Sequence, residues 1–139
     1  MPQLSTYLTF DGNCAEAMRF YERTLGGQLE AMMRVGESPM AEQCAPGSAD
    51  RIMHAKLNLD GRELMGADAM GGQPYEGMKG FAVSLNYPTA DEGRKVFEAL
   101  EVGGQTTMPF QKTFFAEGFG MLVDRFGTPW MVVAHVIEG

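Results

Sequence analysis

The sequence predicts an α+β fold of two βαβββ modules in tandem, with cupped mixed sheets around a central cavity and one helix packed on each sheet. Two internal echoes lead to this fold. Residues 20–28 (FYERTLGGQ) are echoed by residues 97–105 (FEALEVGGQ), and residues 57–65 are echoed by residues 122–131 with a one-residue gap. Because both echoes occur in the same order within similar patterns of strands and a helix, they indicate a duplicated module.

We therefore expect a single domain over residues 1–139, with module one at about 1–70 and module two at about 75–139. The join falls near the Met-Gly-Gly-Gln-Pro stretch at residues 70–74. Each module is expected to read strand, helix and three further strands.

Each helix is predicted between a capping-box pattern and a glycine pair. The first helix has Asn13 with Glu16 as its capping box and the glycines at 26–27 as its stop. The second has Thr89 with Glu92 and the glycines at 103–104. Between these signals, apolar residues recur with helical spacing. The predicted helices are residues 14–25 and 90–101.

Strands are predicted where apolar and polar side chains alternate. The clearest alternation is in residues 4–10, 52–59 and 81–87. Further strands are expected at residues 28–36, 62–68, 105–109, 112–116 and 119–124, and the apolar run at 130–137 is strand-sized. In each module one sheet face is apolar and needs the helix as a cover, while the other face is more polar. Residues 36–50 read as a long loop.

Composition indicates a soluble, acidic protein. The chain of 139 residues has a formal net charge of −7, whereas nucleic-acid binding needs clustered Lys and Arg, so no nucleic-acid partner is expected. No apolar run approaches the ~20 residues of a membrane-spanning helix, and no secretory signal is visible, so no membrane partner is expected. The two cysteines, Cys14 and Cys44, are then expected to be free thiols in the cytoplasm.

The duplicated βαβββ pattern resembles the vicinal oxygen chelate superfamily, which includes glyoxalase I, bleomycin-resistance proteins and extradiol dioxygenases. The resemblance is carried by YLTFDGN at residues 7–13, by residues 53–57 through 64–68, and by FGMLVDRFGTPW at residues 119–130. More narrowly, the chain resembles the PhnB-like branch. The resemblance implies the fold and a homodimer, while the activity stays open because one fold hosts many chemistries.

Metal-dependent members of that superfamily hold a divalent ion with His, Glu or Gln side chains from equivalent strands of both modules. Mapped onto this sequence, those positions fall at or beside Ser5, at Met65, at Met131, and at Gly80 or Ala82. None is a good ligand for Mg, Mn, Fe or Zn, because thioether sulfur suits Cu(I) instead. The resemblance therefore implies that the metal site is absent, and no metal or other cofactor is expected.

Other chemistries have weaker support. His54 is expected either to hydrogen-bond within its polar strand face or to contact a ligand, and His135 to be structural or interfacial. Cys14 falls on the helix stripe assigned to the core, so inert burial is the expectation, and Cys44 is the better reactive candidate. The spacings of a hydrolase nucleophile and of a nucleotide-binding loop do not occur.

Twelve methionines are many for this length. Methionine is flexible and adapts to varied apolar partners, so these residues indicate either an adaptable apolar cavity between the modules or plain core and dimer packing. A small-molecule pocket also needs a few convergent polar groups and aromatic walls. The candidate ligand-binding residues are Tyr7, Arg34, His54, Lys56, Met65, Asn86, Phe114 and Met131.

Three functions compete. The first is a metal-free protein of the glyoxalase/bleomycin-resistance type that binds an apolar or aromatic small molecule, neutral or cationic, in a Met-lined cavity. The second is a glyoxalase-like or dioxygenase-like lyase or isomerase with a relocated metal site, in which a group such as His54 moves the proton. The third is a dimeric interaction module without a small-molecule ligand.

Overall fold

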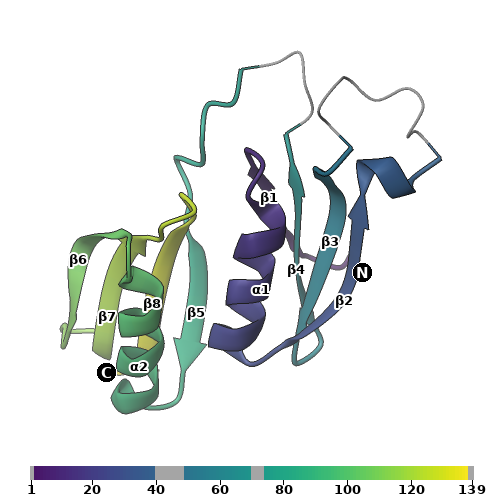
Figure 1. Ribbon diagram of the computed structural model, residues 1–139. Coiled ribbons are helices and arrows are strands. Elements are labelled where there is room, and N and C mark those ends of the chain that lie inside the picture. Colours follow the sequence, from purple (N-terminus) through teal and green to yellow (C-terminus); the bar gives the residue numbers. More distant parts are fainter. Residues whose placement is uncertain (1, 40–48, 70–73, 138–139) are drawn as a thin grey trace. The chain divides into compact units, whose positions relative to one another are not determined.

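The computed structural model describes residues 2–39, 49–69 and 74–137 (Figure 1). The chain divides into two compact units, Met1–Gly77 and Met78–Gly139. Within the described residues each unit holds one α-helix and one mixed four-stranded sheet. The predicted α+β fold of two tandem βαβββ modules is therefore confirmed.

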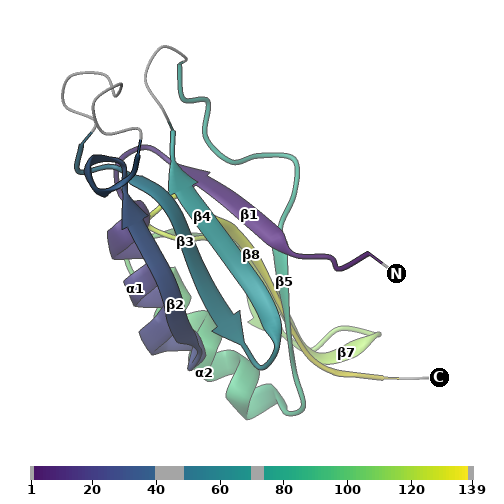
Figure 2. The same cartoon turned by 90° about the vertical axis from the view of Figure 1, so that its right-hand side faces the viewer.

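Unit 1 runs from strand to helix and then through three more strands. Its elements are β1 (Thr6–Phe10), α1 (Cys14–Leu25), β2 (Gln28–Arg34), a 3-10 turn (Val35–Glu37), β3 (Ile52–Leu59) and β4 (Arg62–Asp68). The strand order is β1-β4-β3-β2, with β1 parallel to β4 and the other neighbours antiparallel. Figure 2 shows these four strands side by side, with α1 behind them.

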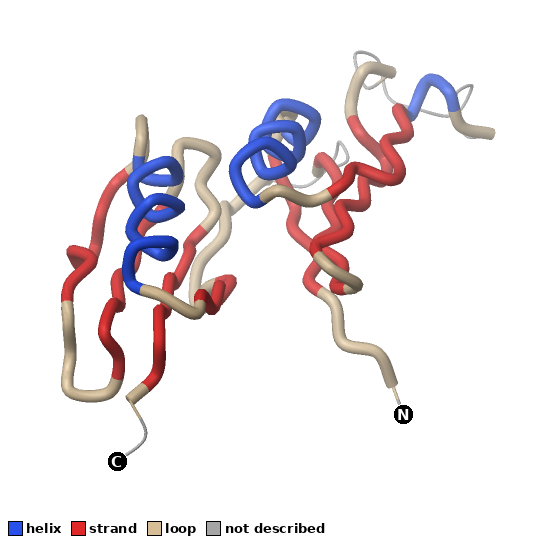
Figure 3. The backbone as a smooth tube through the Cα atoms, turned by 90° about the horizontal axis from the view of Figure 1, so that it is seen from below, coloured by secondary structure: helices blue, strands red, loops and turns tan. Residues whose placement is uncertain are grey.

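Unit 2 repeats this connectivity. Its elements are β5 (Val83–Tyr87), α2 (Ala90–Glu101), β6 (Gln105–Gln111), β7 (Ala116–Val123) and β8 (Pro129–Val136). The strand order is β5-β8-β7-β6, again with the first strand parallel to the last one in sequence. Figure 3 shows α2 lying along one face of this sheet.

Each helix covers one sheet face because its apolar residues recur every three or four positions. In α1 the buried stripe is Cys14, Ala17, Met18 and Tyr21, and in α2 it is Gly93, Phe97 and Leu100. These stripes meet the buried strand residues Leu8, Phe10, Ala55 and Leu57 in unit 1, and Leu122, Trp130, Val132 and Ala134 in unit 2. Neither α1 nor α2, the helices of the described chain, has the length and apolar character that a membrane span requires.

Both predicted helices are confirmed to the residue, but the two capping boxes have different outcomes. The Thr89 hydroxyl accepts a hydrogen bond from the Glu92 backbone N–H at 3.2 Å, as a helix cap does. The Asn13 side chain makes no cap hydrogen bond. The buried carboxylate of Asp68 accepts the Cys14 backbone N–H instead, at 3.0 Å.

The separate strand predicted at residues 112–116 is wrong. Strand β6 continues to Gln111, and β7 begins only at Ala116. Between them the Thr113 backbone N–H donates to the Ala116 carbonyl at 3.0 Å, and the Thr113 hydroxyl accepts the Ala116 N–H at 3.2 Å. These local bonds close a turn, because a threonine hydroxyl competes with strand pairing for nearby backbone groups.

Candidate functional site

Unit 1 leaves one face of its sheet uncovered by α1. On β1, Tyr7 is 51% exposed, whereas the next residue, Leu8, is buried on the core side. Tyr7 pairs with Met65 in β4, and Met65 pairs with Lys56 in β3. His54 lies two residues before Lys56, so it shares the same face. The structure thus brings four predicted ligand-binding residues onto one surface, called here the open face of unit 1: Tyr7, His54, Lys56 and Met65.

Charged and amide groups cluster around Lys56 on this face. The Lys56 Nζ atom lies 3.4 Å from Glu63 Oε2 and 3.8 Å from Glu30 Oε1. The Asn58 side-chain amide donates to Glu30 Oε2 at 3.4 Å. Since these side chains are a third or more exposed, their ion pairs contribute little to folding stability. They instead offer both donors and acceptors to a molecule that lies on the face.

An aromatic pair lies beside these charges. The ring centroids of Tyr7 and His54 are 6.2 Å apart, and the ring planes are tilted by 32°. Met33, the β2 partner of His54, is 45% exposed. Two rings and polarizable thioethers on a half-exposed surface can contact a flat apolar ligand by dispersion and stacking.

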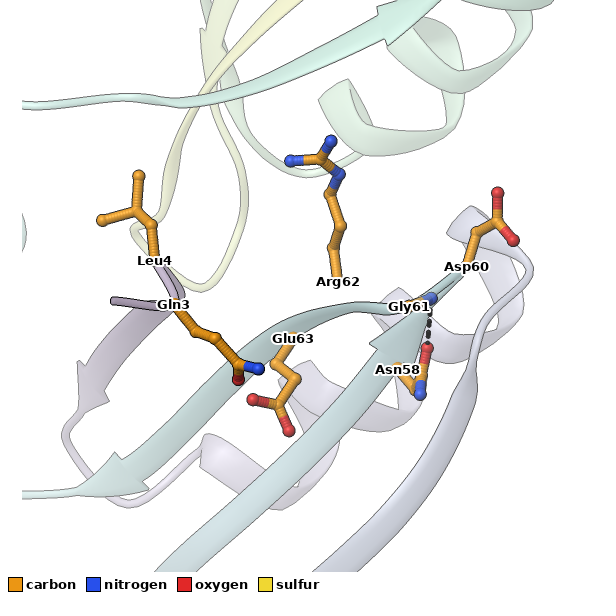
Figure 4. A pocket seen from close by; sticks show the side chains of 7 residues that line it. All are labelled: Gln3, Leu4, Asn58, Asp60, Gly61, Arg62 and Glu63. Carbon is orange, nitrogen blue, oxygen red and sulfur yellow. Dashed lines mark hydrogen bonds between the residues drawn. The ribbon is translucent and has the colours of Figure 1, made fainter. Parts of the chain in front are cut away.

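A hollow of about 560 Å³ lies at the β3–β4 turn, where the open face of unit 1 ends (Figure 4). It is lined by Gln3, Leu4, Asn58, Asp60, Gly61, Arg62 and Glu63. Most of these side chains are polar, and none belongs to the predicted ligand-binding set. The Gly61 backbone N–H donates to Asn58 Oδ1 at 2.8 Å, which holds the turn that forms the floor. The hollow therefore suits a polar group better than an apolar body.

Unit 2 has a sheet face of very different chemistry opposite α2. Met131 lies between the fully buried residues Trp130 and Val132, so its side chain projects from the other face. Its register partners are Ser84 in β5 and Met121 in β7, and Met121 pairs in turn with Met108 in β6. Two residues further along β8, Val133 pairs with Asn86 in β5 and with Phe119 in β7. This surface, the open face of unit 2, includes the predicted residues Asn86 and Met131.

Two predicted ligand-binding residues lie apart from these groups. Arg34 ends β2, pairs with Ile52 and has its guanidinium 3.8 Å from the carboxylate of Glu37. Phe114 is 93% exposed in the β6–β7 connection, with its ring edge-on to that of Phe115 at 5.2 Å. The alternation argument did not apply to either residue, because both lie where the strand pairing ends.

The positions that a divalent cation would use do not fit such an ion. Ser5 precedes β1, and Gly80 and Ala82 precede β5, so only Met65 and Met131 lie in strands. Met65 offers a thioether with the Lys56 ammonium at the paired position, which repels a cation. Among residues 2–39, 49–69 and 74–137, no three His, Cys, Asp or Glu side chains are grouped so that they could hold a metal ion.

The cysteine and histidine candidates have separate outcomes. Cys14 is fully buried at the start of α1, as expected from the helix stripe. Burial, with a smaller effect of the Asp68 carboxylate, raises the pKa of the Cys14 thiol to about 12, so this thiol is inert near neutral pH. His135 is exposed near the end of β8 with a φ of 50°. Cys44 lies outside the described residues.

Sequence reasoning missed Glu30 as a member of the open face of unit 1. By strict alternation along β2, Glu30 and Ala31 would point to opposite faces. The register between β2 and β3 shifts between Leu29 and Ala31, which brings the Glu30 carboxylate to Lys56 and Asn58. A bulge of this kind depends on pairing with a distant strand, and no local sequence signal marked it.

Comparisons with known proteins agree with this architecture. The family model described as 3-demethylubiquinone-9 3-methyltransferase matches residues 2–133. Among solved structures, protein PA1353 from Pseudomonas aeruginosa is 44% identical, with a TM-score of 0.91 and coverage of 97% of this chain and 98% of that one. A putative 3-demethylubiquinone-9 3-methyltransferase, PhnB protein, from Bacillus cereus is 26% identical, with a TM-score of 0.80 and coverage of 96% and 99%.

A more distant likeness bears on the fold. The glyoxylase/bleomycin resistance protein/dioxygenase domain from Frankia sp. EAN1pec is 16% identical, with a TM-score of 0.66 over 97% of this chain and 98% of that one. Together with the tandem βαβββ units, this likeness confirms the fold expected from the resemblance. The chain belongs to the PhnB-like family described as 3-demethylubiquinone-9 3-methyltransferase.

Proposed function

We propose that this protein binds an apolar or aromatic small molecule without the divalent cation that metal-dependent relatives use. The observation that carries the proposal is the line Tyr7, Met65 and Lys56 across the open face of unit 1. At the position where the resemblance places a metal ligand, this line has a thioether flanked by a phenol ring and an ammonium group. Such a surface holds a ligand by ring contact and hydrogen bonding, whereas a metal site needs hard donors.

The ligand class follows from the groups on the open face of unit 1. The Tyr7 and His54 rings favour a flat ring, and the Lys56 and Glu63 side chains supply a donor and an acceptor for a hydroxyl or carbonyl group on it. The family description names a demethylated ubiquinone, which is a ring of this kind with an apolar tail. On the same face, Met33 and Met65 would accommodate an apolar part, since thioether side chains adapt to varied shapes.

Methyl transfer is the activity that the family description names. A glycine-rich turn between a parallel strand and a helix is a common way to hold a nucleotide cofactor. In the described residues β1 leads into α1 through Asp11-Gly12-Asn13, and no such glycine-rich turn is present there. We therefore propose binding of the ring compound rather than methyl transfer to it.

Two further properties belong to this proposal. The protein is proposed to act in the cytoplasm, in line with the free, buried thiol of Cys14. It is also proposed to form a homodimer, as the superfamily resemblance implies. Size-exclusion chromatography with light scattering measures the mass in solution, and a single species at the 15.2 kDa monomer mass would contradict the dimer.

A thermal-shift screen of quinones, hydroxyquinones and neutral polycyclic aromatics tests the proposal. A compound at 100 times its Kd adds about 2.7 kcal/mol to the free energy of unfolding and raises the Tm. Tyr7→Ala and Lys56→Gln should each reduce the shift. Lys95→Gln is the matched control, because Lys95 is exposed on α2, on the other side of the unit 2 sheet from its open face.

The outcomes separate the alternatives. A Tm rise that Tyr7→Ala removes and Lys95→Gln retains would support ligand binding at the open face of unit 1. No rise with any compound would contradict the proposal and favour an interaction module. Turnover of a compound that needs added Fe, Mn, Ni or Zn would instead favour a lyase or isomerase with a relocated metal site.

A further inference from the structure

We propose that Met108, Met121 and Met131 form a binding site for a soft monovalent cation, Cu(I) or Ag(I), on the open face of unit 2. The ion is bound through three thioether sulfurs and undergoes no redox change there. This inference goes beyond the proposed function and does not depend on it, because the proposed small-molecule site is on the open face of unit 1.

The strand register brings the three residues together. Met108 in β6 pairs with Met121 in β7, and Met121 pairs with Met131 in β8, so the three stand in one row across adjacent antiparallel strands. Directly opposite residues of such strands have Cβ atoms roughly 4.5–5.5 Å apart. The Sδ atom lies two flexible bonds beyond Cβ, so the outer two side chains can lean inward and all three sulfurs can meet one ion above Met121.

The surroundings of the row select for a soft ion. The neighbouring paired positions on the same face are Phe119 with Val133, and Val123 with Pro129, none of which bears a carboxylate or an imidazole. The polar groups at the paired positions of β5, the Ser84 hydroxyl and the Asn86 amide, carry no charge. Divalent Mg, Mn or Zn therefore gains little here, whereas thioethers bind Cu(I) well. The net charge of −7 on the chain favours the approach of any cation.

The row is accessible to an ion from solvent. Met108 is 41% exposed, and Met121 and Met131 are half-buried. The backbone beneath them is firmly placed, because Trp130, Val132 and Leu122 alternate with the methionines and are buried under α2. A row of donors on a fixed sheet needs only side-chain rotation to bind, which keeps the ordering cost low.

Met131 occupies a position to which the resemblance assigns a metal ligand. The superfamily resemblance places a hard ligand of a divalent ion at this strand position, whereas this chain has sulfur there, in the adjacent strand β7 and in β6 beyond it. The site thus differs from the expected one in donor type, and lies wholly within unit 2.

Isothermal titration of the full chain with Ag(I), in chloride-free buffer, tests the proposal, with Cu(I) under ascorbate and argon as the second probe. All proteins carry Cys44→Ser, because a free thiolate binds these ions more tightly than a thioether does. One ion should bind per chain. Met108→Leu, Met121→Leu and Met131→Leu should each weaken Ag(I) binding by about tenfold or more, and the triple variant should abolish it. Leucine conserves volume, so the fold should be retained, as circular dichroism would check.

Two controls make the result specific. Met33→Leu alters a methionine that is equally exposed on unit 1 and should leave the Ag(I) affinity unchanged. A thioether has no proton to lose, so the affinity should be equal at about pH 5.5 and about pH 7.5, unlike that of an imidazole or a thiolate.

Three results would overturn the proposal: a Kd of the protein with all three methionines weaker than about 1 mM, undiminished binding by the triple variant, or pH-dependent binding that His54→Gln or His135→Gln removes. In each of these cases the quinone and aromatic screen on the same proteins remains interpretable, because the triple leucine variant leaves the residues of the open face of unit 1 unchanged.

Discussion

The Oδ1 atom of Asp68 accepts a hydrogen bond from the backbone N–H of Cys14 at 3.0 Å, across 54 residues of sequence. The same oxygen accepts the Gly12 N–H at 2.8 Å, and Oδ2 accepts the Ile52 N–H at 2.8 Å. Asp68 is only 3% exposed. One carboxylate at the end of β4 therefore joins the start of α1, the turn before it and the start of β3.

Replacing Asp68 should destabilise the protein far more than replacing Asn13. Asp68→Ala leaves three backbone N–H groups without this acceptor and should lower the free energy of unfolding by about 3 kcal/mol. Asn13→Ala should cost less than about 0.5 kcal/mol, because its side chain makes no cap bond. Urea unfolding measures both, and equal losses would contradict the assignment of Asp68 as the cap.

The Thr89 cap gives a second, smaller prediction. Thr89→Ala removes the acceptor for the Glu92 N–H and should cost about 1 kcal/mol. Thr89→Ser retains the hydroxyl and serves as the matched variant, with a loss of a few tenths of a kcal/mol at most. If both variants lose the same amount, the hydroxyl does not act as the cap.

Stability should fall above pH 9 because of Cys14. Burial, then the Asp68 carboxylate, raises the pKa of this thiol from 9.0 to about 12. The unfolded chain loses the proton first, so the stability contribution is complete below about pH 9 and is lost as the pH rises towards 12. Between about pH 8 and pH 10 the free energy of unfolding should fall by about 1.4 kcal/mol more than in Cys14→Ala.

That comparison uses urea unfolding in a Cys44→Ser background, so that only one thiol titrates. Other groups ionise equally in the two proteins and cancel in the difference. Parallel pH profiles for the parent and Cys14→Ala would show that the thiol is not perturbed by folding.

The packing of α2 on its sheet requires a glycine in β7. A Cβ at Gly120 would lie 2.7 Å from Cε2 of Phe97 and 2.9 Å from Cα of Phe110. Because Phe97 is buried and the second atom belongs to the backbone, Gly120→Ala should cost about 2–3 kcal/mol through overpacking. Glu117→Ala, at an exposed position of the same strand, should change thermal stability little and is the control.

Divalent cations should leave the Tm nearly unchanged. The thioether of Met65 opposite the Lys56 ammonium offers no hard ligand, so millimolar Mn²⁺, Ni²⁺ or Zn²⁺ should shift the Tm by less than about 1 °C. Differential scanning fluorimetry with and without chelator measures this. A rise of several degrees that chelator reverses would contradict a function without a divalent ion.

Much of the candidate site could be expected from alternation alone. Tyr7, His54, Lys56 and Met65 share a face because side chains alternate along a strand, and this periodicity is visible in the sequence. Arg34 and Phe114 do not join that face, because each lies where strand pairing stops. The ligand-binding roles of all six residues stay predictions until a ligand is found.

The sequence by itself determined both helices, the duplicated order of strands and the buried stripe of α1, because each depends on hydrogen bonds and spacing among near neighbours. Only the tertiary structure decided that Asp68 caps α1, that Glu30 reaches Lys56, and that three methionines form a row. These relationships depend on strand register and on a bulge. Both are set by the packing of segments far apart in the chain, and no local pattern contains them.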